Sequence, residues 1–300
     1  MAASEDSTFQ KKVQKLLTKS WKRLSRQVSA VDKNGAVEAI HELRVATRRL
    51  RELVEIGADA VPGSVRRVSI QKLRRARRLC GATRNLDVLL ELIAARIKRR
   101  TSEAELWAPI QRDLESRRES GLKSMRKAID RLDLPSLQQQ WQKGIRSWAK
   151  AQENGSVVKA RRRLDKHLAK RLGQFARARD LAKAPEAKIA DVHRLRLTGK
   201  RLRYVLEAVM EVNGESLAET LEHLRAFQVC LGEWNDLDML AEVLIEHCSR
   251  KRFVRSDPGN AQRLLGVLRN VRERQESKLK DVLALADEIP GLDKQLSSSR

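Results

Sequence analysis

The sequence has 300 residues, with 63 Lys and Arg against 39 Asp and Glu, which gives a formal net charge of +24 at pH 7. A hydrophobic content of 41% is sufficient for packed cores. The composition therefore excludes a disordered basic tail, and the excess of positive charge favours a polyanionic partner. The three cysteines show no CxxC spacing, and their odd number argues against a disulfide framework. No apolar run reaches the roughly 18 residues that a membrane span requires, so we expect a soluble, intracellular protein.

The first predicted helix spans about Phe9–Val31, because apolar residues recur there at intervals of three and four. Its basic residues recur at the same spacing along another face: Lys12, Lys15, Lys19, Lys22 and Arg26. The helix is repeated 151 residues later, where four of these positions hold Arg163, Lys166, Lys170 and Arg177. Since the apolar and basic stripes both match in register, the sequence indicates an internal duplication.

The second predicted helix ends near Gly57 and carries Ala39–Arg51, AIHELRVATRRLR, which returns as Asp191–Arg203, DVHRLRLTGKRLR. At 100° per residue, offsets of 0, 3, 7 and 10 fall within about 80° of arc and form one face roughly 15 Å long. We name the side chains at these offsets the ridge residues: His41, Arg44, Arg48, Arg51, His193, Arg196, Lys200 and Arg203. A single basic run is ordinarily a solvated helix face. Two copies with the same histidine at the head favour a polyanionic ligand.

The third predicted helix runs from about Val65 to Arg99 and contains a second repeated element. Gly81 and Asp87 recur as Gly232 and Asp238, again 151 residues later. A glycine inside a helix is destabilising by up to about 1 kcal/mol relative to alanine, so we expect it to permit a close helix approach or a kink. The two aspartates are predicted to pair with arginines on neighbouring helices.

The remaining elements complete two similar halves. A fourth helix at about Glu103–Arg131 matches one at about Asn260–Asp287, and a connector helix is expected at 135–152. We therefore predict an all-α fold of two four-helix bundles related by duplication and pseudo-twofold symmetry. The first domain is expected at 1–152, including the connector, and the second at 153–300, including a frayed C-terminal tail.

At this point the chain resembles the CHAD family, whose name stands for conserved histidine α-helical domain. The resemblance rests on H-x-L-R-V-A-T-R-R-L-R at His41–Arg51, H-x-L-R-L-T-G-K-R-L-R-Y at His193–Tyr204 and the G-x-x-[RN]-[ND]-L-D elements, and it covers about Phe9–Asp287. It implies two four-helix bundles with a basic surface and a central channel that bind inorganic polyphosphate. The acidic E-x-E-x-K strand of a fused triphosphatase is not found, which favours a stand-alone binding module.

From the repeats and this resemblance we expect the ridge residues of both halves to converge on one shared basic channel. The basic stripe of the first helix and its repeat at Lys166 and Lys170 are expected to flank this channel, joined by Arg74, Arg78 and Arg225. Besides the ridge residues, the predicted polyphosphate-binding set comprises Lys15, Lys19, Lys22, Arg26, Arg49, Arg74, Arg78, Lys166, Lys170, Arg201 and Arg225. The expected location is the cytoplasm, with polyphosphate granules or the nucleus as alternatives.

Three other functions can be weighed from the residues. Basic helical stripes would serve a nucleic-acid backbone equally well, but one tyrosine and four phenylalanines offer few stacking platforms, so nucleic acid is the alternative or a secondary ligand. A metal-dependent polyphosphatase using Asp87, Asp236 and Asp238 is less favoured, because the ridge positions are basic. Arginines one turn from His41 and His193 would repel a metal ion. We expect no catalytic residues, no cofactor, no bound metal and no membrane partner, and the oligomeric state is left open.

Overall fold

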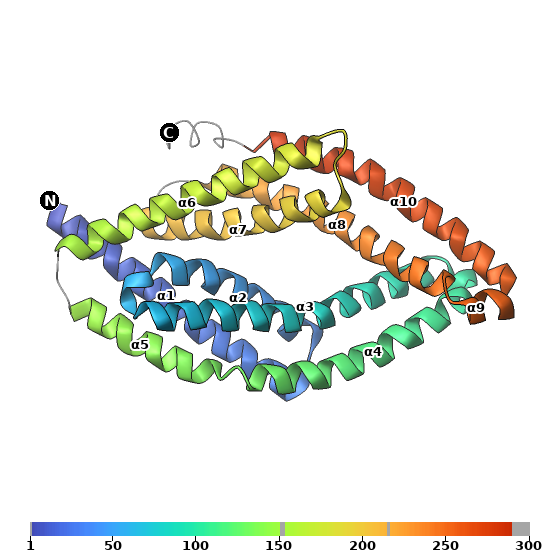
Figure 1. Cartoon of the computed structure of the whole chain (residues 1–300), viewed down its shortest axis with the longest axis horizontal. Helices are drawn as coiled ribbons and strands as arrows, with labels where there is room; N and C mark the ends of the chain where they lie inside the picture. The colour runs from blue at the N-terminus through green and yellow to red at the C-terminus, as the bar shows by residue number, and fades with distance from the viewer. Residues whose placement is uncertain (1, 151–153, 215–216, 290–300) are drawn as a thin grey trace. The chain divides into compact units, whose positions relative to one another are not determined.

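The computed structural model describes residues 2–150, 154–214 and 217–289. Every regular element in these ranges is helical, which confirms the predicted all-α class. The α-helices are α1 (Ala2–Asn34), α2 (Val37–Ile56), α3 (Gly63–Arg99), α4 (Ala104–Asp130), α5 (Leu134–Lys150), α6 (Asn154–Lys183), α7 (Ile189–Asn213), α8 (Ala218–Cys248), α9 (Lys251–Ser256) and α10 (Pro258–Asp287) (Figure 1). Short 3-10 turns lie at Ala58–Ala60 and Thr101–Glu103. Residues 290–300 of the predicted C-terminal tail, Ile289–Arg300, and the last positions of the connector lie outside the described residues.

The helix ends follow local chemistry that the sequence contains. The α2 helix ends at Gly57, whose amide donates to the carbonyl of Leu53. Gly214 adopts φ 77° after α7, a left-handed conformation that favours glycine at a helix end. Asp257 accepts a hydrogen bond from the backbone amide of Asn260 and so caps the first turn of α10. The short α9 helix was not predicted, because six residues are too few for a periodic pattern.

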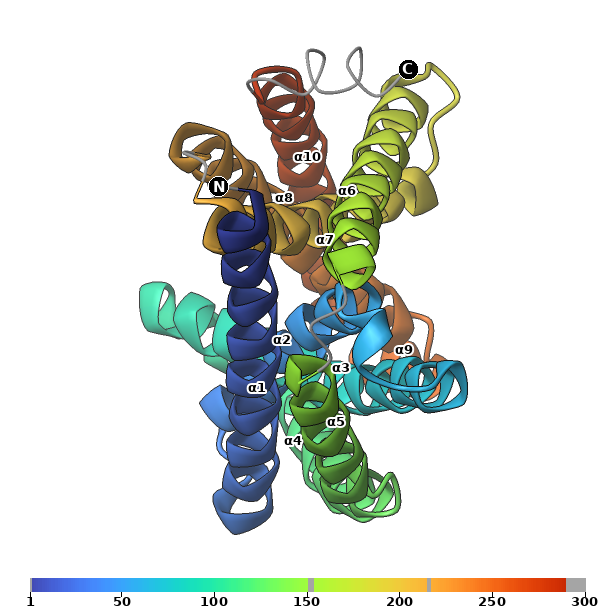
Figure 2. The same cartoon turned by 90° about the vertical axis from the view of Figure 1, so that its left-hand side faces the viewer.

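The chain divides into two compact units. Unit 1 contains the described residues of 1–81, 125–224 and 289, and unit 2 contains 82–124 and 225–288. In unit 1, α1 packs on α2, α6 packs on α7, and each of α1 and α2 also contacts both α6 and α7. Figure 2 shows α5 beside α1, on which it packs. The centre of unit 1 is therefore a group of four helices drawn from both halves of the sequence.

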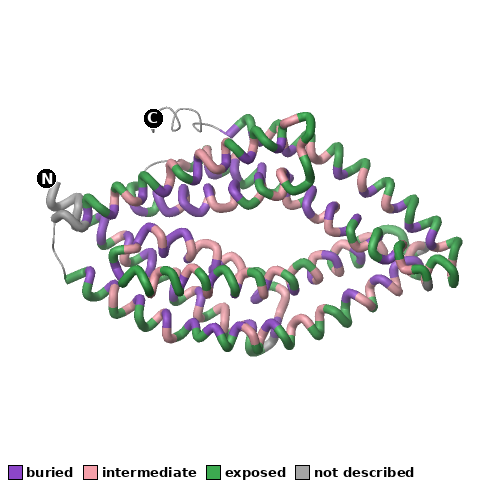
Figure 3. The backbone as a smooth tube through the Cα atoms, in the orientation of Figure 1, coloured by how far each residue is buried: buried purple, intermediate pink, exposed green. Residues whose placement is uncertain are grey.

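The apolar core of unit 1 contains stripes of side chains that the helical periodicity marks. Figure 3 shows buried positions alternating with exposed ones along these helices. Trp21 of α1 and Trp141 of α5 are fully buried with their ring centroids 6.0 Å apart. The indole Nε1 of Trp141 donates to the Oγ of Ser69 at 2.9 Å, which satisfies both buried polar groups. These contacts fix α5 against α1 and α3 within the unit.

Unit 2 has a separate core formed by the second part of α3, most of α4, the larger part of α8, and α10. Trp107, Ile93, Leu244 and Leu264 are among its fully buried side chains, one from each of these four helices. This unit also mixes both halves of the sequence. The compact units therefore differ from the predicted division at 152 and 153, because the long helices bury their apolar stripes against helices of the other half.

Unit 2 confirms the predicted role of the repeated aspartates. Asp87 is buried on α3, and its Oδ1 accepts a hydrogen bond from Arg118 Nε of α4 at 2.5 Å. Asp238 is buried on α8, and its Oδ1 accepts from Arg272 Nη1 of α10 at 3.0 Å. Each carboxylate thus pairs with an arginine of the adjacent helix, as the sequence indicated.

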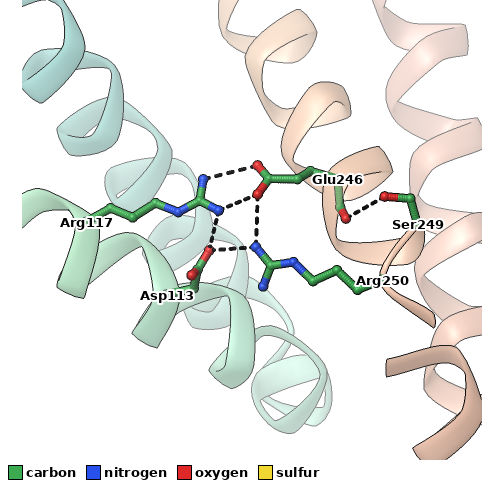
Figure 4. Close-up of polar contacts among 5 residues, drawn as sticks. All are labelled: Asp113, Arg117, Glu246, Ser249 and Arg250. Carbon is green, nitrogen blue, oxygen red and sulfur yellow. Dashed lines mark hydrogen bonds and ion pairs between the residues drawn. The ribbon is translucent and has the colours of Figure 1, made fainter. Parts of the chain in front are cut away.

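A second ionic cluster joins α4 to the end of α8 in unit 2 (Figure 4). Arg117 forms two hydrogen bonds to Glu246 and lies 3.0 Å from Asp113. Arg250 Nη2 lies 2.9 Å from Glu246 Oε1 and 3.2 Å from Asp113 Oδ2. The hydrogen bonds from Arg117 and Arg250 lower the pKa of Glu246 to about 2 despite partial desolvation. Opposite charges alternate around this cluster, so it holds the two helix surfaces together.

Candidate functional site

The two ridge-bearing helices lie against each other in unit 1. The α2 and α7 helices are in contact, and the repeated leucines of both segments are fully buried: Leu43, Leu50, Leu195 and Leu202. Because these leucines face the core, the ridge residues are placed along the flanks of the packed helices. The ridge arginines and Lys200 are half-buried, whereas His41 is exposed and His193 is half-buried.

The ridge residues of α2 and α7 act on one another electrostatically. Desolvation lowers the pKa of Arg44 to about 9, and the positive charges of Arg48, Arg196 and Arg77 add to the effect. The pKa of Lys200 is lowered well below its ordinary value, first by desolvation and then by Arg196, Arg48 and Arg44. A guanidinium group with a pKa near 9 still carries its charge at pH 7. The structure therefore brings together Arg44, Arg48, Arg196, Lys200 and Arg203, as the sequence predicted.

Tyr204 organises the arginines at one end of this cluster. Its ring is buried, with the guanidinium carbons of Arg203 and Arg49 at 5.1 and 5.7 Å from the ring centroid. Arg203 Nη2 donates to the tyrosine hydroxyl at 3.4 Å. Desolvation lowers the pKa of Arg48, and a hydrogen bond with the Tyr204 hydroxyl partly opposes that change. Cation–π contacts of this kind stabilise closely spaced guanidinium groups.

Carboxylates form ion pairs with some of the predicted polyphosphate-binding residues but not with others. Glu207 lies 3.2 Å from Arg49 and 3.6 Å from Arg203. By contrast, among the residues that the structure describes, no carboxylate forms an ion pair with Arg44, Arg48 or Lys200. Positive charge without an ion-paired carboxylate thus lies at the middle of the two ridges.

Glu52 forms a buried ionic network beside Arg51, at the C-terminal end of the ridge on α2. Its Oε2 lies 2.7 Å from Arg171 Nη2 and 3.0 Å from His167 Nε2, both on α6, and Arg51 lies 3.8 Å from its Oε1. Desolvation opposes ionisation of Glu52, but the His167 hydrogen bond and the charges of Arg171 and Arg51 lower its pKa. Arg201 adjoins the same carboxylate. Arg51 and Arg201 therefore serve this internal network as well as the ridge surface.

The cluster encloses a small cavity of about 20 Å³. Its walls include Arg48, Arg51, Lys200 and Arg201 of the predicted set, together with Glu52, Arg77, Leu197 and Tyr204. A volume of this size is close to that of one water molecule. A phosphate chain must therefore contact the outer, solvent-facing side of the ridge residues or displace their flexible side chains.

The repeat pattern did not identify Arg77. This residue lies on α3 in the run Arg74–Arg78, and its pKa is lowered by desolvation and by Arg48 and Arg51. Its buried Nε has no hydrogen-bond acceptor among the described residues. Position 228, its counterpart 151 residues later, is a glutamine, so the duplication offers no signal for it. The proximity of Arg77 to the ridge required the packing of α3.

Gly81 has the predicted role in close approach. A Cβ at this position would lie 3.2 Å from Arg44 Nη1, and Arg44 Nη1 donates to the Gly81 carbonyl at 3.4 Å. The absence of a side chain thus lets the guanidinium group approach the α3 backbone. At Gly232, by contrast, a Cβ would meet no atom within 4 Å, so close approach of a neighbouring group does not account for the glycine of the second copy.

The other predicted residues occupy different surfaces. Lys15, Lys19, Lys22 and Arg26 of α1 line a groove against α5. Their stripe faces α5 because the remaining faces of α1 pack on α2, α6 and α7. Exposed Arg74 and Arg78 adjoin Arg77, and exposed Lys166 and Lys170 lie on α6. Arg225 is exposed on α8 in unit 2.

Residues that could bind a metal are spread through the described helices. Within those helices no group of three or more His, Cys, Asp or Glu side chains has metal-binding geometry. His167 contacts Glu52, His223 contacts the carbonyl of Glu219, and His247 packs on Phe253 with ring centroids 4.4 Å apart. Desolvation and the charge of Arg250 lower the pKa of His247. Among the described helices none is both long and apolar enough to cross a lipid bilayer.

Comparison with known proteins gives a consistent result. The family model described as CHAD domain matches residues 9–245. The crystal structure of the CHAD domain from the plant Ricinus communis is similar with a TM-score of 0.66 and 21% sequence identity, covering 93% of this chain and 92% of that chain. PptA from Streptomyces chartreusis is similar with a TM-score of 0.57 and 13% identity, covering 91% and 98%. At these identities both likenesses concern the fold. No curated protein sequence matches this chain.

Proposed function

Because the chain belongs to the CHAD domain family, we propose that it binds inorganic polyphosphate through the ridge residues of α2 and α7 without hydrolysing it. The observation that carries the proposal is the cluster of Arg44, Arg48 and Lys200, which approach one another without an ion-paired carboxylate among the described residues. Like charges held together destabilise the folded protein. A bound polyanion relieves that repulsion.

The chemistry of the cluster suits phosphate in particular. Guanidinium groups match phosphate oxygens with paired N–H donors, and Lys200 adds a compact positive charge. Exposed His41 can donate a hydrogen bond in either protonation state. Carboxylates near the ridge are engaged by arginines: Glu52 by Arg171, and Glu207 by Arg49. This environment favours binding of a phosphate chain over its hydrolysis, which ordinarily requires a metal held by carboxylates or an activated nucleophile.

Affinity should increase with chain length. Once the first phosphates are bound, later contacts become intramolecular, which can raise the overall affinity by roughly 10²–10⁴. Displaced counterions also favour the complex, so binding should weaken as salt increases. Pyrophosphate is too short to contact many of the ridge residues. It is therefore expected to bind orders of magnitude more weakly than long chains.

The direct test is titration with polyphosphate of defined lengths and with pyrophosphate, using isothermal titration calorimetry. The quadruple variant Arg44→Ala, Arg48→Ala, Arg196→Ala and Lys200→Ala should lose at least roughly 100-fold in affinity while remaining helical by circular dichroism. The matched control replaces four exposed cations of unit 1 by alanine and so removes the same charge: Arg67, Lys127, Lys159 and Arg162. The control should bind like the parent, apart from a small loss in long-range attraction. Equal losses in both variants, or equal affinity for pyrophosphate and long chains, would contradict the proposal.

Two further measurements separate the alternatives. Release of phosphate from polyphosphate in the presence of magnesium or manganese would identify a polyphosphatase instead of a binding module. Competition between RNA and long-chain polyphosphate at fixed salt compares the two polyanions directly. The proposal expects polyphosphate to displace RNA at far lower phosphate concentration than the reverse.

A further inference from the structure

A second cationic surface of unit 1 lies in the groove between α1 and α5. The groove has a volume of about 990 Å³. Lys15, Lys19, Lys22 and Arg26 line it from α1, and Arg146 lines it from α5; all five side chains are exposed. None of the described residues that line this groove is acidic. The groove is therefore a recess with positive charge on both walls.

The dimensions of the groove suit a rod-shaped ligand. Its basic residues begin at Lys11 and end at Arg26, a distance of roughly 22 Å along an α-helix at 1.5 Å per residue. A helix with side chains is about 10–12 Å in diameter. The groove is open to solvent along one side, so a docked helix would be embedded along one face and exposed along the other.

The inner surface of the groove is mostly apolar. The buried side chain of Ile145, the methyl group of Ala149 and the methylene stems of the lysines contribute to it. The hydroxyl of Ser25 donates to the side-chain oxygen of Gln138, so these polar groups of the wall satisfy each other. A phosphate chain gains nothing from an apolar floor. An amphipathic helix with acidic flanks gains both burial and ion pairs.

We propose that this groove docks an acidic amphipathic helix of a partner protein. The apolar face of that helix packs on Ile145 and Ala149, and its acidic residues flank the apolar face and pair with Lys15, Lys19 and Arg146. The occupant is assigned by charge complementarity together with the apolar floor and the length of the recess. The site is distinct from the ridge residues, which belong to α2 and α7.

The test uses a defined probe, a fluorescein-labelled 16-residue peptide with leucines at helical intervals of three and four and glutamates elsewhere. Fluorescence anisotropy should give saturable binding at moderate salt. A peptide of the same composition, scrambled so that no apolar face forms, should bind at least roughly tenfold more weakly, because it retains the charge but loses the burial. Polyglutamate of equal charge should also bind weakly.

Two groove variants locate the binding. Lys15→Glu, Lys19→Glu and Lys22→Glu together should reduce peptide affinity by more than about tenfold. Ala149→Trp fills the recess at an exposed position without changing the charge, and it should reduce peptide affinity while leaving polyphosphate binding unchanged. The matched control reverses three exposed charges elsewhere in unit 1: Lys127, Lys159 and Arg162. It should retain peptide binding apart from the loss expected from the altered net charge.

Each remaining outcome overturns the proposal. Equal binding of the amphipathic, scrambled and polyglutamate probes would show that charge alone attracts them. Loss of peptide binding in the ridge variant, with retention in Ala149→Trp, would place the peptide on the ridge. No binding of the peptide to the parent, or binding of anionic phospholipid vesicles in its place that Ala149→Trp abolishes, would also reject a helix-docking groove.

Discussion

Arg44→Met is expected to stabilise the folded protein while weakening polyphosphate binding. In the folded state, desolvation and the neighbouring positive charges lower the pKa of Arg44 from its ordinary value to about 9. A one-unit change in pKa corresponds to about 1.4 kcal/mol, so keeping this guanidinium group charged costs about 5 kcal/mol relative to the unfolded chain. Water and flexible neighbours relax around a half-buried charge, and the variant loses the long hydrogen bond to the Gly81 carbonyl. We therefore expect a net gain of about 1–3 kcal/mol.

The assay is urea denaturation followed by circular dichroism, with the midpoint and slope compared between parent and variant. Arg67→Met, at an exposed position of α3, is the matched control and should change stability by no more than about 0.5 kcal/mol. Raising the salt concentration should stabilise the parent more than Arg44→Met, because salt screens the repulsion. If Arg44→Met is less stable than the parent at low salt, the positive charge at the ridge is not a source of instability and the reasoning is refuted.

Three further predictions concern pH and backbone packing. Bound polyphosphate should raise the lowered pKa of Lys200, so binding should take up protons and should weaken as the pH rises. Calorimetry in buffers of different ionisation enthalpy should detect this proton uptake in the parent but not in Lys200→Met. The ion pairs of Glu246 lower its folded-state pKa to about 2. At pH values above the unfolded-state pKa, these half-exposed pairs should contribute about 0.5–1 kcal/mol to the free energy of unfolding, and this contribution should be lost as the pH falls towards 2. The stability of Glu246→Gln should therefore depend less on pH in the acidic range. Gly144→Ala should strongly destabilise unit 1, because the new Cβ would lie 1.9 Å from the Ala60 carbonyl oxygen. The new Cβ of Gly266→Ala meets no atom within 4 Å, so this variant should stabilise α10 by about 0.5–1 kcal/mol. Thermal melts that give both variants the same stability would contradict both expectations.

The helical periodicity predicted most of the local structure. Stripes of apolar residues at intervals of three and four located the long helices, and the ends of α2 and α3 coincide with Gly57 and Arg99 as expected. The same periodicity placed each set of ridge residues on one helix face. Duplication supplied the correspondence between Arg44 and Arg196 and between Asp87 and Asp238. These features depend on residues close in sequence, so the sequence contains the information that determines them.

The choice of neighbours depended on the tertiary structure. An apolar stripe states which face of a helix is buried but not which helix covers it, and leucines of both halves are interchangeable in this respect. Packing alone decided that α1 directs Lys15 and Lys19 towards α5, and that α3 brings Arg77 to the ridge. It also decided that Glu52 meets Arg171 more than 100 residues away. The sequence by itself determined the helices and the charge on their faces, whereas the structure decided which charges meet, because electrostatic interaction depends on distance and desolvation in three dimensions.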